Sequence, residues 1–332
     1  MTSSLADPIR LGSLLLPNRV FYSPLAGCSD FPFRQMSARF SPGLIYCEMV
    51  KMDALVRNDP TTLHILDYNS DMHPIGGQIV GAKRHLAGQA AKIIEDLGFD
   101  VLDLNCGCPV DKVTKDGGGS GLLKNPEQIG DIIAEMVAAV KIPVTVKIRA
   151  GWDEKNICAG EITRIAEEAG AKAIAIHGRT RVQAYRGPAN WDYIREAKEA
   201  ARNILVIGNG DVFSAEAAHA MKEQTGCDIV LASRGTLGHP YLAEDVCRYA
   251  KGLPVLERTI DESIELLKQH FALSRMYYRP KKAVTDMRRI ACWYLKKSAA
   301  NKDFRKAFSK ASSLSEVEEL LGDLSQLCAC AA

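Results

Sequence analysis

The sequence predicts an α/β fold, in which a (β/α)8 TIM barrel over residues 1–250 is followed by a smaller all-α helical bundle over residues 251–332. Eight short apolar segments rich in β-branched residues recur along the first part, and segments of helical period separate most of them. The length also fits a barrel of about 250 residues with a second domain. An open doubly wound sheet is the less favoured alternative, because no Gly-x-Gly-x-x-Gly motif follows the first predicted strand.

The predicted strands and helices follow one another in order. The strands are Arg19–Leu25, Leu44–Val50, Ile75–Val80, Val101–Asn105, Val144–Ile148, Ala173–His177, Leu205–Gly208 and Ile229–Ser233. The helices between them include Lys83–Leu97, Pro126–Val140, Ala159–Ala169 and Ala215–Glu223. Asn125 and Ser214 stand at expected N-caps, and Gly98 and Gly170 stand where helices are expected to end. Strands alternating with helices form a parallel sheet, and eight such units predict closure into a barrel.

Composition points to a cytoplasmic protein with reduced thiols. The ten cysteines are scattered, and none forms a Cys-x-x-Cys pair. The apolar run Leu11–Leu16 is too short for a secretory signal and ends at Pro17. No segment approaches the ~20 apolar residues that a membrane helix needs. We therefore expect no membrane association.

The net charge of +2 is unevenly distributed. Residues 251–311 hold 15 Lys and Arg against 6 Asp and Glu, whereas residues 312–332 are acidic. A basic segment on an otherwise nearly neutral chain is typical of a protein that binds a polyanion such as nucleic acid. A solvated helix surface explains the charge equally well, so charge alone leaves both interpretations open.

Polar residues follow the predicted strands, as the functional rim of a barrel requires. They are Ser29 and Asp30 after the first strand, Glu48 and Lys51 at the second, Gln78 in the third, Asn105 and Cys108 at the fourth, Lys147 and Arg149 at the fifth, His177, Arg179 and Thr180 at the sixth, Asn209 and Asp211 at the seventh, and Ser233 and Arg234 at the eighth. We expect these side chains to meet at one end of the barrel.

The segment Asp103–Pro109, followed by a glycine cluster at 117–121, is the predicted centre of the chemistry. If Leu104 points to one face of its strand, Cys106 and Cys108 share that face, but Pro109 ends regular pairing just after Cys108. Cys108 is therefore predicted at the mouth, as a nucleophile or proton donor, and Cys106 in the core. Either thiol taken alone is more often a small buried hydrophobe.

Three further side chains can be interpreted either as functional or as structural. Lys147 lies inside a buried strand, where a charge is costly unless it meets an anion, so function is favoured there. Gln78 fits a satisfied core amide equally well. His177 alone would be structural, but beside Arg179 it indicates an anion-binding rim. The loops 208–211 and 233–235 have the glycines and the arginine of a phosphate site after strands seven and eight.

Six motifs in order resemble those of the tRNA-dihydrouridine synthases, flavin-dependent enzymes that reduce a uridine in tRNA, and the bacterial DusB-like group is the most similar. They are Pro24-Leu25-Ala26-Gly27, Gly77-Gln78, Asn105-Cys106-Gly107-Cys108-Pro109, Lys147-Ile148-Arg149, His177-Gly178-Arg179-Thr180 and Gly208-Asn209-Gly210-Asp211. The resemblance covers nearly the whole chain. It departs from the family pattern at Leu25, Ser233, Cys106 and Cys47, none of which removes a reacting group.

The resemblance implies the chemistry and the residue roles. NADPH, or NADH, would reduce bound FMN, which would give hydride to C6 of a D-loop uracil while Cys108 protonates C5. The cofactor-binding residues would be Pro24, Leu25, Ala26, Gln78, Lys147, His177, Asn209, Gly210, Asp211, Ser233 and Arg234, and the substrate-binding residues Asn105 and Arg179. No metal is implied.

The resemblance also implies that the helical bundle binds tRNA. Predicted helices span Glu257–Tyr278, Lys281–Lys297, Asp303–Ala311 and Ser315–Leu327. The basic residues are Lys281, Lys282, Arg288, Arg289, Lys296, Lys297, Arg305 and Lys306, interleaved with Tyr277, Tyr278, Trp293 and Tyr294. Ile290 replaces a residue that is more often polar in the family. We expect a monomer without an obligate protein partner.

Two other functions remain open. A flavin barrel acting on free pyrimidine, as in dihydroorotate dehydrogenases, would not need the basic segment 251–311. An RNA-binding protein without turnover would not need Cys108, Lys147 and His177.

Overall fold

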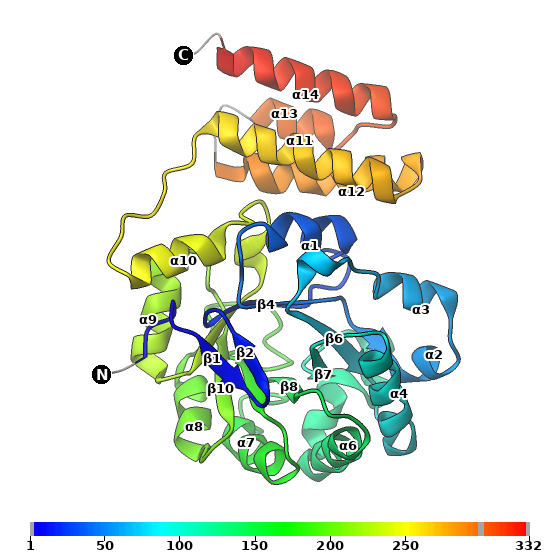
Figure 1. The fold of residues 1–332 in the computed structure, drawn as a ribbon, viewed down its shortest axis with the longest axis vertical. Helices are drawn as coiled ribbons and strands as arrows, with labels where there is room; N and C mark the ends of the chain where they lie inside the picture. The colour runs from blue at the N-terminus through cyan, green and yellow to red at the C-terminus, as the bar shows by residue number, and fades with distance from the viewer. Residues whose placement is uncertain (1–2, 298–301, 330–332) are drawn as a thin grey trace.

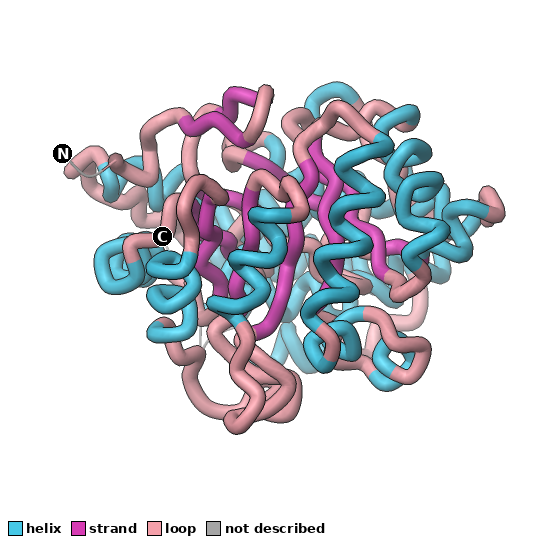
Figure 2. Tube along the Cα trace, turned by 90° about the horizontal axis from the view of Figure 1, so that it is seen from below, coloured by secondary structure: helices cyan, strands magenta, loops and turns pink. Residues whose placement is uncertain are grey.

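The computed structural model describes residues 3–297 and 302–329 and shows a closed barrel of parallel strands surrounded by helices (Figures 1 and 2). The strands are β3 (Val20–Tyr22), β4 (Leu44–Tyr46), β6 (Ile75–Val80), β7 (Val101–Cys106), β8 (Val144–Arg149), β9 (Ala173–His177), β10 (Leu205–Asn209) and β11 (Ile229–Ala232), with a two-residue strand β5 (Val50–Lys51) on β6. Pairing of β4 with both β3 and β6 closes the ring. The predicted barrel is confirmed.

Helices cover the outside of the barrel. They are α1 (Phe31–Ala38), α2 (Met52–Val56), α3 (Pro60–Ile65), α4 (Arg84–Asp96), α5 (Asp111–Thr114), α6 (Pro126–Ala139), α7 (Ala159–Glu168), α8 (Asp192–Ala200), α9 (Ala215–Thr225) and α10 (Leu242–Ala250). The predicted cap Ser214 accepts a hydrogen bond from Ala217 N–H, whereas Asn125 occupies the cap of α6 without a side-chain bond. Gly98 and Gly170 follow α4 and α7 with φ of 86° and 94°, a conformation that glycine adopts without strain.

A short hairpin that the sequence analysis did not predict covers the amino-terminal end of the barrel. It consists of β1 (Ile9–Leu11) and β2 (Leu14–Leu16). Leu11 and Leu16 are fully buried against residues near the starts of the barrel strands, including Leu44 and Ile229. This end is therefore closed by apolar packing, and the opposite end is left for the chemistry.

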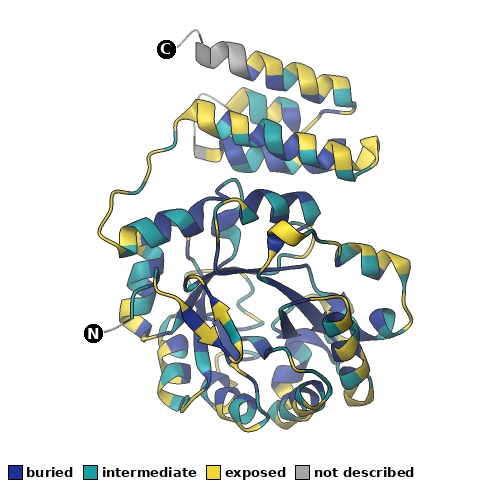
Figure 3. Cartoon of the chain, in the orientation of Figure 1, coloured by how far each residue is buried: buried dark blue, intermediate teal, exposed yellow. Residues whose placement is uncertain are grey.

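Four helices form a second hydrophobic core beyond the barrel (Figures 1 and 3). They are α11 (Ile260–Tyr277), α12 (Pro280–Tyr294), α13 (Lys302–Phe308) and α14 (Leu314–Ala329). Thr259 begins α11 with a capping box to Glu262. The predicted C-terminal helices are thus present, and Ile290 is buried in their core.

The helical bundle packs on α1, beside the carboxyl ends of the barrel strands. Tyr277 stacks on Phe31 with ring centroids 4.3 Å apart, and its hydroxyl donates to Asp67 at 2.6 Å. Arg289 reaches Cys28 Sγ at 3.9 Å, in the loop after β3. The bundle therefore lies close to the open end of the barrel. Among the described residues, no helix is both long and apolar enough to cross a membrane.

Candidate active site

A cavity of about 450 Å³, the mouth cavity, opens at the carboxyl ends of the strands. This volume lies in the usual range for cofactor and ligand sites. Its lining includes all but one of the residues to which the resemblance assigns a role: Pro24, Leu25, Ala26, Gln78, Asn105, Cys108, Lys147, His177, Asn209, Gly210, Asp211, Ser233 and Arg234. The exception is Arg179, which is buried behind the cavity wall.

The loop after β7 presents Cys108 to the cavity. Asn105 Oδ1 accepts hydrogen bonds from the N–H groups of Gly107 and Cys108, at 3.1 and 2.8 Å. The carbonyl of Cys108 accepts from the N–H and the hydroxyl of Ser120, at 3.0 and 2.9 Å. Cys106, in contrast, is fully buried, and burial raises the pKa of its thiol well above the usual value. The structure thus separates the two thiols, as the end of regular strand pairing before Pro109 predicts.

Lys147 brings a positive charge to the cavity floor. Its Nζ donates to Asn209 Oδ1 at 3.1 Å, and no carboxylate among the described residues forms an ion pair with it. Burial, followed by the charge of Arg149, lowers the pKa of Lys147 to about 8, while Asp103 opposes the shift. A cation in this setting is suited to an anionic ligand.

His177 ends β9 beside this charge. It is 8% exposed, and burial, followed by the charges of Lys147 and Arg149, lowers its pKa well below the usual value. The imidazole is therefore neutral near pH 7 and offers one donor and one acceptor. Gly210 follows β10 with a φ of 126°, and a Cβ there would lie 2.7 Å from Ala189 Cβ and 3.2 Å from His177 Cδ2. Only glycine fits at this position.

Asp211 connects two arginines in the cavity wall near the predicted phosphate loops. It accepts two hydrogen bonds from Arg179, at 2.9 and 2.7 Å, and lies 3.3 Å from Arg234. Burial acts to raise the pKa of Asp211, but the bonds from Arg179 and the Ala189 N–H outweigh it and lower the pKa. Arg179 also donates to the Gly187 carbonyl at 2.6 Å. Its guanidinium is therefore engaged with the protein in this structure.

Asn209 joins the two loops 208–211 and 233–235, which are predicted to bind a phosphate. Its Nδ2 donates to the Leu231 carbonyl at 2.7 Å and to Ser233 Oγ at 2.9 Å. Arg234 begins a 3-10 turn and lies over the Tyr185 ring at 4.5 Å. A Cβ at Gly235 would come within 2.1 Å of the Val212 carbonyl oxygen, so the two loops approach backbone to backbone.

Two further lining residues, Arg149 and Tyr185, have no role assigned by the resemblance; Arg149 was expected at this end of the barrel, whereas Tyr185 was not. The Arg149 guanidinium donates to the carbonyls of Gly107, Thr180 and Ala184 at 2.8–3.0 Å and lies 5.5 Å from the Tyr185 ring. The motif Lys147-Ile148-Arg149 contained the signal for the arginine, because strand alternation puts both cations on one face. Tyr185 lies in a long loop, where spacing carries no such information.

The basic side chains of the bundle are mainly at its surface. The exposed ones are Lys281, Lys282, Arg288, Lys296 and Lys306, and the partly buried ones are Arg289 and Arg305. The side chain of Lys297 lies outside the described residues. Among the aromatic side chains, Tyr294 is in the bundle core, whereas Tyr277 and Tyr278 contact the barrel through Asp67 and Asp30. Part of the predicted positive surface is therefore free for a polyanion.

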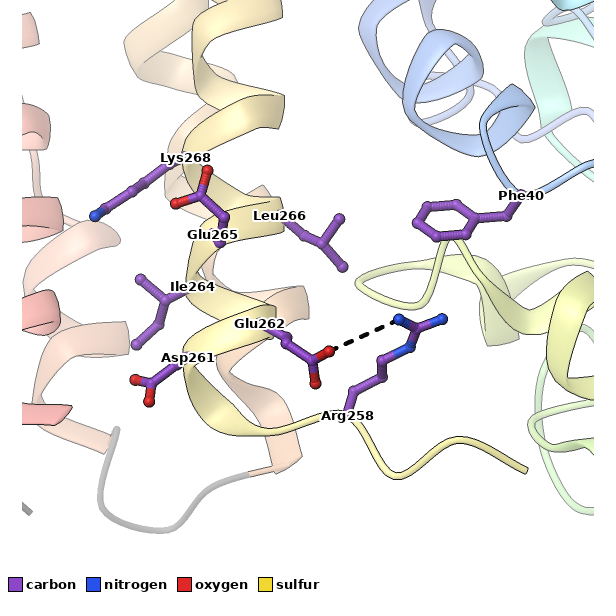
Figure 4. A pocket seen from close by; sticks show the side chains of 8 residues that line it. All are labelled: Phe40, Arg258, Asp261, Glu262, Ile264, Glu265, Leu266 and Lys268. Carbon is purple, nitrogen blue, oxygen red and sulfur yellow. Dashed lines mark ion pairs between the residues drawn. The ribbon is translucent and has the colours of Figure 1, made fainter. Parts of the chain in front are cut away.

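A second hollow, of about 510 Å³, lies between α11 and the barrel (Figure 4). It is lined by Phe40, Arg258, Asp261, Glu262, Ile264, Glu265, Leu266 and Lys268. Arg258 is already paired, with Glu244 at 2.7 Å and Glu262 at 3.8 Å. This hollow holds neither a thiol nor a histidine, whereas the mouth cavity brings Cys108, Lys147 and His177 together at the carboxyl ends of the strands, so the mouth cavity is the candidate active site.

Comparison with known proteins agrees with this site. Residues 21–329 match the family model described as dihydrouridine synthase (Dus). The probable tRNA-dihydrouridine synthase 1 of Synechocystis sp. is 36% identical, over 95% of this chain and 89% of its own. The tRNA-dihydrouridine synthase B of Pseudomonas aeruginosa is 34% identical, over 91% of each chain.

Solved structures share the fold. Histamine dehydrogenase from Rhizobium sp. matches with a TM-score of 0.58 and 13% identity, over 81% of this chain and 51% of its own. Morphinone reductase in complex with tetrahydroNAD matches with a TM-score of 0.53 and 15% identity, over 79% and 94%. The predicted resemblance to the DusB-like group is confirmed, and the chain belongs to the dihydrouridine synthase family.

Proposed function

We propose that this chain reduces a uridine in the D-loop of tRNA to 5,6-dihydrouridine, with FMN as cofactor and NADPH as reductant. The observation that carries the proposal is the mouth cavity of a dihydrouridine synthase family member. Cys108 and Lys147 both line this cavity, and Lys147 has no carboxylate partner among the described residues. A thiol and a buried cation together suit proton transfer beside an anionic cofactor.

The residues of the cavity fit FMN in two respects. Lys147 supplies a positive charge with no carboxylate partner among the described residues, which suits the negative charge of a reduced flavin ring. The loops at 209–211 and 233–235 bring Arg234 and close-packed glycines to one side, which suits a phosphate. We assign contacts with the flavin ring and its ribityl chain to the remaining lining residues Pro24, Leu25, Ala26, Gln78 and His177.

Within this cavity, the protein holds and transfers a proton. Bound flavin supplies the hydride for C6 of the uracil. Cys108 Sγ is assigned as the acid that delivers a proton to C5, and its loop is held by Asn105 and Ser120. Because an acid must carry its proton, this role needs a thiol and not a thiolate.

Asn105 and Arg179 are assigned to the uridine side of the cavity, in different ways. Asn105 lines the cavity directly. Arg179 contacts Asp211 and the Gly187 carbonyl, so we assign it the indirect role of holding that wall. The arginines that line the cavity are Arg149 and Arg234.

We assign tRNA binding to the helical region, with a boundary near residue 250 between catalytic and RNA-binding domains, in a cytoplasmic monomer. The exposed basic side chains of α12 support this assignment, because they lie on the bundle that reaches Cys28 at the cavity through Arg289. A uridine must leave the folded tRNA to enter the cavity, as in other enzymes that act on a base.

The function is tested by reconstituting the purified chain with FMN and comparing tRNA with free uridine or uracil as substrate. We expect dihydrouridine only in tRNA, with binding that weakens steeply as salt rises. Turnover of the free base at a comparable kcat/KM, with no dependence on salt, would favour the pyrimidine alternative. Salt-sensitive tRNA binding without FMN binding would favour the RNA-binding alternative.

A further inference from the structure

Asp103 is a buried carboxylate below the mouth cavity. It lies on β7, is 3% exposed, and is not part of the cavity lining. In the barrel register it stands between Gln78 on β6 and Thr145 on β8. Its Oδ2 accepts from Gln78 Nε2 at 2.7 Å, and its Oδ1 accepts from Thr145 Oγ1 at 2.6 Å. A carboxylate is costly to bury, so its retention at this position needs an explanation.

A chain of hydrogen bonds leads from this carboxylate to the Cys108 loop. Gln78 Oε1 accepts from Asn105 Nδ2 at 2.9 Å, and Asn105 Oδ1 accepts from the N–H groups of Gly107 and Cys108. We call the sequence Asp103–Gln78–Asn105–Cys108 the amide relay. Every bond in it runs in one direction, with each donor pointing back toward the carboxylate.

The direction of the relay follows from its two ends. A carboxylate is acceptor-only, so Gln78 must turn its NH₂ group toward Asp103. Its oxygen then faces Asn105, which must present its own NH₂ group to Gln78 and its oxygen to the Cys108 loop. The backbone N–H groups there are donors only, and they require that oxygen. If either amide flips, two like groups meet in a buried setting, which is unfavourable.

We propose that Asp103 is a positioning residue that sets the orientation of both amides through the amide relay and thereby fixes the backbone of Cys108. The proposal deepens and rests on the proposed function, because it explains how the thiol is held for proton transfer. Under this proposal, burial of the Asp103 charge lowers the stability of the fold, and the gain is a single orientation of the Gln78 and Asn105 amides.

The test is Asp103→Asn, read in the as-purified full chain without added tRNA. An asparagine can donate to Gln78 as well as accept, so only the loop N–H groups then still select the direction of the relay. The reversed relay, with the Asn105 NH₂ against those N–H groups, becomes less costly than in the wild type and is populated more often. We expect alkylation of Cys108 by iodoacetamide, mapped by mass spectrometry, to be about fivefold to tenfold faster. We also expect faster hydrogen exchange of the Gly107 and Cys108 amides. The full pH–rate profile of alkylation separates access to the thiol from a change in its pKa.

The sharper variant is Asp103→Asn combined with Gln78→Glu. It keeps the net charge and moves the acceptor-only group one step along the relay, so Asn105 again has only one allowed orientation. We expect the alkylation rate and the amide protection to return to within about twofold of the wild type. Thr145→Val is the matched control: it removes a hydrogen bond from the same carboxylate without touching either amide, and should leave both readouts close to wild type.

The proposal is overturned if Asp103→Asn, shown to be folded by its circular dichroism and thermal transition, keeps the wild-type alkylation rate and exchange. It is also overturned if the double variant has the same fast alkylation and amide exchange as Asp103→Asn. The orientation imposed by an acceptor-only carboxylate would then not be what holds the Cys108 loop. Neither readout uses turnover. A failure here therefore leaves the proposed function standing, whereas failure of FMN reconstitution would not change these two results.

Discussion

The two ends of the barrel interior differ although the same strands build both. Near the strand starts, Phe21, Leu44, Val101, Ala173, Ile207 and Ile229 form an apolar cluster with the N-terminal hairpin. Toward the strand ends, the same ring of strands contributes Gln78, Asp103, Asn105, Lys147, His177 and Asn209. The first set stabilises the fold by burial, and the second costs stability because charged and polar groups are desolvated. One end therefore holds the barrel together, and the other carries the polar groups to which we assign the chemistry.

The largest expected effect is that of Cys108→Ala at the polar end. Removal of a general acid should lower tRNA reduction by about 10²–10⁴-fold, while NADPH still reduces the bound flavin. The measurement is single-turnover dihydrouridine formation. Cys106→Ala, two residues earlier but fully buried, is the matched control and should keep the reaction. Full tRNA reduction by Cys108→Ala would remove the assignment of the acid.

At the apolar end, Phe21→Ala should lower the stability of the fold and leave the reaction rate unchanged. Phe21 is fully buried, so the substitution should lower the free energy of unfolding by about 3–5 kcal/mol. Its cavity lies away from the mouth, so molecules that remain folded should keep their rate of tRNA reduction. Denaturant unfolding and single-turnover rates measure the two quantities separately. A large loss of rate with unchanged stability would show that the two ends are not independent.

Lys147 tests whether a positive charge at the polar end is required for turnover. Because its pKa is lowered to about 8, its positive charge is present below that pH and is lost as the pH rises through it. Flavin-dependent turnover should therefore fall by up to about tenfold above pH 8. Lys147→Met should show the low rate at every pH. Should both proteins have the same pH profile, the charge would have no role in turnover.

A gain in stability is expected from Asp103→Asn. Burial raises the pKa of Asp103 to about 6, against the opposing hydrogen bonds of Gln78 and Thr145. A raised carboxyl pKa means that the folded state favours the protonated form, so wild-type stability falls as the pH rises from about 4 to 6. The variant lacks this loss and should be about 1–3 kcal/mol more stable at pH 7.5. Denaturant unfolding at pH 5 and 7.5 measures it; equal stabilities at pH 7.5 would contradict it.

Much of this architecture could be predicted from the sequence. The strands were found within a few residues of their observed bounds because each is a short apolar run between helical segments. The N-terminal hairpin was missed because its three-residue strands are too short to show alternation. Position at a strand end predicted much of the cavity lining, although the lining does not include Ser29, Asp30, Glu48, Lys51 and Thr180, which were expected at the same end. Position also could not show that Arg179 turns toward Asp211. The amide relay was also not predicted, because hydrogen-bond direction depends on neighbouring strands that only the closed barrel brings together.

The most direct test of the central claim is a single anaerobic turnover. The flavin-loaded protein is reduced with one equivalent of NADPH, separated from nucleotide, and mixed with unmodified tRNA. We predict that the visible absorption of oxidised flavin returns together with about one dihydrouridine per flavin, as the stoichiometry of hydride transfer requires. Flavin that stays reduced until oxygen is admitted, with no dihydrouridine in the tRNA, would contradict the assignment of the polar end of the barrel.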